Sequence, residues 1–219
     1  MSLLILFLGF LPGYLFLNNF SKGLNVEEKI GASFGLTTLL IGAGYVTTYL
    51  TGASIKKVFP QIVLYCLVFL IILQVFHRKR ESRYTCETTL LSLLASVFIL
   101  QYLLKVSFQP MIPFYPMGAD YYEHYQRVQV FMNLRDEDPY VDIFPFWSIP
   151  DRTPLFSIIG AFFLALFRDR YWILQVTSCL FNSVLILPSY LIAKKMFNGK
   201  VGIFTVLLVS RSPFLTENA

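Results

Sequence analysis

The chain has 219 residues, of which 56% are hydrophobic and only 14% are charged. Soluble domains carry about 25% charged residues, so this composition excludes an ordinary soluble protein and predicts an all-α, polytopic membrane protein. The net charge of +5 does not indicate a nucleic-acid partner, because the basic residues stand in short clusters where cytoplasmic loops and lipid headgroups account for them. The three cysteines, Cys66, Cys86 and Cys179, have no paired spacing and indicate neither disulfides nor a zinc site.

Six apolar runs are long enough to cross about 30 Å of hydrocarbon, which predicts about six transmembrane helices. They lie near residues 2–20, 30–51, 59–76, 87–107, 171–193 and 200–214. We interpret the first three as an amino-terminal three-helix bundle, residues 1–76, followed by a second module, residues 77–219. The second run is rich in Gly, Thr and Ala, which predicts that neighbouring helices approach it closely.

The orientation of these runs follows from charge. The segment from His77 to Arg83 holds four basic residues and is the clearest cytoplasmic marker. The fourth run then leads outward, so we expect a multi-pass cell-membrane protein with residues 108–170 in an extracytoplasmic loop. Residues 108–153 hold seven acids and three bases, whereas the remaining chain holds six acids and fifteen bases. Lys56 and Lys57 then lie outside, which counts against this orientation.

The apolar run from Pro154 to Phe167 has fourteen residues and is short for a span. If it crosses the bilayer, Lys194, Lys195 and Lys200 lie outside. If it lies along the outer surface, these lysines return to the cytoplasm. We favour the second interpretation because cytoplasmic loops are enriched in lysine and arginine.

The external loop carries a candidate site at the start of a predicted helix, Tyr121–Leu134. Asp120 precedes this helix and can cap it. Glu123, His124 and Arg127 follow at i+3, i+4 and i+7 and share its face. A cap and a solvated Glu123–Arg127 pair are the simpler explanation.

The surroundings of these residues favour a site over that simpler explanation. Tyr121 and the other tyrosines of the loop are typical of a sugar-binding or interfacial surface. An aromatic belt alone does not explain an acid, a histidine and an arginine in register with them.

The sequence G-A-D-Y-Y-E-H-Y from Gly118, followed by R-T-P-L-F from Arg152 that opens a short apolar helix, resembles the GT-C fold glycosyltransferases. Residues 185–213 are also similar to the next two helices of that family, so the similarity covers about residues 87–219. The family takes sugars from polyprenyl-phosphate carriers. It includes protein mannosyltransferases, aminoarabinose transferase-like proteins and oligosaccharyltransferases.

The resemblance implies transfer of a sugar to a glycan, lipid or protein acceptor on the extracytoplasmic side. Asp120 matches the family's catalytic base, or its ligand for a divalent metal such as Mg²⁺ or Mn²⁺. Arg152 matches the arginine of an R-P-P-L type motif, although Thr153 replaces the first proline. The residues expected to bind substrate are Tyr121, Glu123, His124, Arg127 and Arg152, and those expected to bind metal are Asp120, His124 and Glu217.

Because the family normally continues with further spans, we expect an amino-terminal portion of a longer transferase. Two other classes stay open. A non-catalytic membrane subunit or scaffold would use Asp120 only as a cap. A small transporter is disfavoured because the runs hold almost no ionisable residue besides Lys105.

Overall fold

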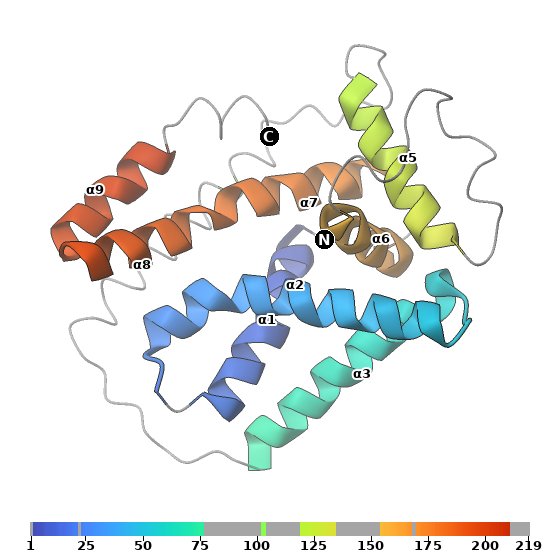
Figure 1. The fold of residues 1–219 in the computed structure, drawn as a ribbon, viewed down its shortest axis with the longest axis horizontal. Coiled ribbons are helices and arrows are strands. Elements are labelled where there is room, and N and C mark those ends of the chain that lie inside the picture. The colour runs from blue at the N-terminus through green and yellow to red at the C-terminus, as the bar shows by residue number, and fades with distance from the viewer. Residues whose placement is uncertain are drawn as a thin grey trace.

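The computed structural model describes residues 2–21, 23–76, 102–103, 119–134, 154–167 and 170–210. All the regular elements in this part of the chain are helices, which confirms the all-α prediction (Figure 1). They are α1 (Ser2–Phe20), α2 (Val26–Leu50), α3 (Ile55–Phe76), α5 (Ala119–Asn133), α6 (Leu155–Phe167), α7 (Tyr171–Val184), α8 (Ile186–Met196) and α9 (Gly199–Ser210).

Four described helices are long and apolar enough to cross a membrane. They are α1, α2, α3 and the continuous segment Tyr171–Met196, which consists of α7 and α8 together. These correspond to four of the six predicted runs. Most of the run 87–107 lies outside the described residues, and the run 200–214 is described only as α9, which is shorter than a span.

Helix α2 begins four residues before the predicted start, because Asn25 caps it. The Asn25 side chain accepts a hydrogen bond from the Glu28 backbone N–H at 2.8 Å, and the Glu28 carboxylate accepts one from the Asn25 N–H at 3.0 Å. This reciprocal pair satisfies donors that have no partner inside the helix. It brings Glu27 and Lys29 into the first turns of the helix.

Helices α1 and α2 touch backbone to backbone near Gly13. The Gly13 N–H donates to Thr37 Oγ1 at 2.9 Å. A Cβ atom on Gly13 would lie only 1.9 Å from the carbonyl oxygen of Ser33. The predicted close approach to the second run is therefore confirmed, and glycine is the residue that permits it.

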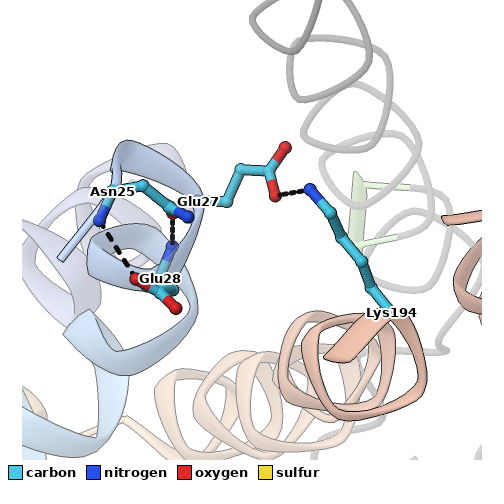
Figure 2. A network of polar contacts seen from close by, with 4 residues as sticks. All are labelled: Asn25, Glu27, Glu28 and Lys194. Carbon is cyan, nitrogen blue, oxygen red and sulfur yellow. Dashed lines mark hydrogen bonds and ion pairs between the residues drawn. The ribbon is translucent and has the colours of Figure 1, made fainter. Parts of the chain in front are cut away.

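Polar side chains join four helices at one end of the bundle. We call this the charged end and define it by Asn18, Glu27, Lys29, Gln74 and Lys194. Glu27 of α2 forms an ion pair with Lys194 of α8, beside the capping box of α2 (Figure 2). Lys29 Nζ donates to Asn18 Oδ1 at 3.0 Å, and Asn18 Nδ2 donates to Gln74 Oε1 at 2.9 Å. The α1–α2 turn, the end of α3 and the end of α8 therefore lie together.

The chain reaches the opposite end of the bundle before α5. The Tyr102 hydroxyl donates to the carbonyl of Ser2, at the start of α1, at 3.0 Å. Because α8 ends at the charged end, α7 begins at this same opposite end. Gln74 lies at the charged end, whereas Tyr102 and the start of α7 both lie at the opposite end. The contacts therefore favour the interpretation in which Pro154–Phe167 does not cross.

Helix α6 is buried among other helices of the bundle. Helices α2, α3, α5 and α7 all pack against it, and its residues from Ser157 to Leu164 are buried. In Figure 1 it is seen almost end-on, while α2 and α7 run across the picture. This burial fits the sequence, because Leu155–Phe167 offers only Ser157 as a polar group and an interfacial helix needs a polar face. The position of α6 relative to the bilayer stays a prediction.

Candidate functional site

The predicted helix of the external loop is present as α5, Ala119–Asn133. It starts two residues before the predicted start, so Asp120 lies within the first turn and is not the N-cap. Alanine has the highest helix propensity of any residue type, so Ala119 favours the earlier start of the helix. The inward side of α5 carries Val128 and Met132, which are fully buried, together with Arg127.

His124 and Tyr125 hold the first half of α5 against two other helices. The ring of His124 meets that of Phe156 on α6 edge to face, with centroids 5.6 Å apart. Phe156 in turn meets Phe181 of α7 at 5.3 Å. The ring of Tyr125 meets Tyr171, at the start of α7, edge to face at 5.4 Å. These contacts fix the rotation of α5 about its axis.

The middle of α5 rests on Gly160 of α6. A Cβ atom at Gly160 would lie 2.7 Å from Val128 Cγ2 and 3.1 Å from Leu174 Cδ1. Real Cβ atoms do not come as close as the first of these distances. The glycine therefore sets how closely α5 approaches α6 and α7.

The far end of α5 is held by α2. The Tyr45 hydroxyl donates to the carbonyl oxygen of Phe131 at 3.0 Å. This carbonyl lies in the last turn of α5, where carbonyls lack partners inside the helix. The Tyr45 ring meets those of Phe131 at 5.9 Å and Phe59 at 5.3 Å, and Phe59 meets Phe162 of α6 at 5.7 Å. We call Tyr45, Phe59, Phe131 and Phe162 the aromatic end.

Sequence reasoning missed Tyr45, because it lies 86 residues from Phe131. No local pattern in the second run distinguishes it from a tyrosine that faces lipid.

The guanidinium of Arg127 is an unexpected feature of the site. The side chain is only 5% exposed, so it is not the solvated partner that the i, i+4 spacing from Glu123 predicts. An arginine side chain stays charged inside proteins. A buried positive charge acts strongly on a neighbouring anion because the local dielectric constant is low.

The structure brings together two of the predicted site residues, His124 and Arg127, on the bundle side of α5. The backbones of Asp120, Tyr121 and Glu123 lie in α5, while their side chains lie outside the described part. Arg152 and Glu217 also lie outside it. Among the described residues, no three His, Cys, Asp or Glu side chains are grouped to hold a metal ion, so the set Asp120, His124 and Glu217 stays a prediction.

The helices on which α5 rests carry the match to a known family. Residues 151–218 match the family model for dolichyl-phosphate-mannose-protein mannosyltransferases. This confirms the resemblance to GT-C glycosyltransferases across α6–α9, which is just under a third of the chain. The match supports a membrane glycosyltransferase of the mannosyltransferase type. The α1–α3 bundle and α5 lie outside the matched region.

No curated protein and no solved structure matches the chain.

Proposed function

We propose that the chain is a membrane glycosyltransferase, or the amino-terminal part of one, that moves a sugar from a polyprenyl-phosphate carrier to an acceptor. The acceptor is a glycan, a lipid or a protein on the extracytoplasmic side. The observation that carries this proposal is the mannosyltransferase match over α6–α9, because α5 packs directly on α6 and α7 through His124, Tyr125 and Val128.

The side of the membrane on which the reaction is proposed to occur is inferred from the two ends of the bundle. The basic segment from His77 to Arg83 directly follows α3, which ends at the charged end. Basic segments of this kind stay in the cytoplasm. The start of α7, and with it the Tyr125–Tyr171 contact of α5, lies at the opposite end. We therefore place α5 on the extracytoplasmic side.

The arginines of the site fit the departure of an anionic carrier. When the bond between the sugar and the carrier phosphate breaks, the carrier keeps the electron pair and its negative charge grows. Arg127, which is buried on α5, and Arg152, three residues before α6, are proposed to offset that charge. Hydrogen bonds from guanidinium to phosphate are among the stronger ones in proteins.

Asp120 is proposed as the base that takes the proton of the acceptor. It lies one turn before His124 on α5, so both share one side of the helix. A base must come within about 2.6–3.2 Å of the group that it deprotonates. Glu123 and Tyr121 are proposed to orient the sugar, since a tyrosine ring offers a sugar both an apolar face and a hydroxyl.

In the alternative role of Asp120 as a metal ligand, a divalent cation would be held by Asp120 and His124, with Glu217 as a third ligand. A mixed carboxylate and imidazole set suits Mn²⁺ better than Mg²⁺, which prefers oxygen ligands. When bound, such an ion would supply positive charge at the phosphate.

The test is transfer of labelled mannose from polyprenyl phosphate by membranes that contain the chain together with any continuation of its reading frame. Asp120→Asn should lower the rate by at least about a hundredfold, the usual contribution of a general base. The same change at Asp138, in the same loop, should leave the rate unchanged. Equal rates for Asp120→Asn and wild type would falsify the role of Asp120. No transfer by wild type with any sugar donor would favour a non-catalytic scaffold.

A further inference from the structure

The aromatic end joins the amino-terminal bundle to the candidate site. Tyr45 is 5% exposed and belongs to α2, outside the region that matches the mannosyltransferase family. Its hydroxyl bonds to α5 and its ring packs on Phe59, whose ring packs on Phe162 of α6. One side chain therefore fixes α5 relative to α6, the helix on which His124 also rests.

The geometry of α5 transmits this contact to the proposed site. Phe131 lies seven residues after His124, which is two helical turns and about 10 Å along the axis. A short helix moves as a rigid rod, so a shift at Phe131 tilts the turn that carries Asp120 and His124. Misplacement of a reacting group by about 1 Å can cost roughly a hundredfold in rate.

The contact between Val128 and Gly160 is the point about which α5 would tilt. Val128 of α5 fits against this glycine so closely that α5 cannot slide toward α6 there. With Val128 fixed, contacts on either side of it set the angle of the helix. They include His124 with Phe156 and Tyr125 with Tyr171 before the pivot, and Tyr45 with Phe131 after it.

We propose that Tyr45 is a positioning residue for sugar transfer, which sets the angle of α5 on α6 through its hydroxyl bond to Phe131. This inference rests on the proposed function. It assigns the amino-terminal bundle a part in the reaction, although Tyr45 does not touch substrate.

The test compares Tyr45→Phe with wild type in the complete protein in membranes or detergent. The change keeps the ring and removes only the hydroxyl, so the folded yield and melting temperature should stay close to wild type. Hydrogen exchange of the α5 peptide, residues 119–134, should rise about fivefold, which corresponds to one lost hydrogen bond. The kcat per folded molecule should fall about five- to tenfold, with the KM for the donor unchanged.

The matched control is Tyr65→Phe on α3, because Tyr65 is 71% exposed. It should change neither exchange nor kcat. Tyr45→Leu, which also removes the ring, should lower kcat further than Tyr45→Phe.

Three outcomes would overturn the inference. Unchanged exchange in α5 would show that the hydroxyl bond does not hold the helix. Raised exchange with unchanged kcat would make Tyr45 merely structural. A rise in exchange spread equally over α2, α3 and α5 would show general destabilisation. If wild type transfers no sugar, the proposed function fails, while exchange still decides whether Tyr45 holds α5.

Discussion

The two ends of α2 are held by different chemistry. At the charged end, Glu27 pairs with Lys194, and the Asn25 capping box closes the first turn. At the aromatic end, Tyr45 contacts Phe59 and Phe131 edge to face or tilted, and donates one hydrogen bond. The ion pair joins the start of α2 to the end of α8, whereas the ring contacts join α2 to α3 and α5, and α3 to α6.

The two ends of α2 therefore have different roles, one in membrane topology and the other in the geometry of the candidate site. The charged end joins α2 to α8 and decides that α7 starts at the opposite end. The aromatic end joins α2 to α5 and α6, and decides how the candidate site is presented. A substitution at the charged end should therefore have little effect on the geometry of the candidate site. A substitution at the aromatic end should have little effect on membrane topology.

The largest expected effect is at Gly13, since a side chain there displaces α2 and disturbs both ends. Gly13→Ala puts a Cβ atom 1.9 Å from the Ser33 carbonyl oxygen, so the backbones must separate. We expect a cost of more than about 3 kcal/mol and loss of the monodisperse protein in detergent. Gly35→Ala is the matched control, because nothing lies within 4 Å of its Cβ position. Equal melting temperatures for the two variants would contradict the packing.

The next effect concerns the charged end alone. Lys194→Gln leaves the Glu27 carboxylate, which is 7% exposed, without its cation, and should cost about 2 kcal/mol. Glu27→Gln should cost less, about 1 kcal/mol, because the Lys194 side chain is 29% exposed and can reach water. Chemical denaturation measures both.

The control for the charged end is Lys195→Gln, on the exposed side of α8, which should change little. If the double variant of Glu27 and Lys194 costs the full sum of the single changes, the two side chains do not interact.

A smaller effect is expected at the pivot of α5. Gly160→Ala should cost about 1–2 kcal/mol and lower sugar transfer, because its Cβ collides with Val128. Val128→Ala removes the colliding methyl groups, so the double variant should recover transfer. A Gly160→Ala enzyme with full activity, or a double variant with no recovery, would contradict the role of this contact.

The sequence predicts the parts of this structure that depend on local pattern. Hydropathy locates α1, α3 and α7–α8, and the spacing of His124 and Arg127 correctly predicts one shared face of α5. The early start of α2 could also have been predicted, because Asn25 and Glu28 have capping-box spacing. The absence of a polar face in Pro154–Phe167 could have indicated the burial of α6.

Contacts between distant residues could not be predicted in this way. Glu27 and Lys194 lie 167 residues apart, and Tyr45 and Phe131 lie 86 apart. Each of these residues has an ordinary local explanation, as a charge near a membrane surface or an aromatic residue in a span. Only the packing of the helices makes them partners.

The most direct test of this arrangement of the helices is the accessibility of the two ends of the bundle to an impermeant thiol reagent. Single cysteines at positions 23, 56 and 200 replace exposed residues, in a background where Cys66, Cys86 and Cys179 are alanine. With the charged end in the cytoplasm, position 56 should react in intact cells, whereas positions 23 and 200 should react only after permeabilisation. Reaction of position 200 in intact cells, while position 23 stays protected, would contradict this arrangement.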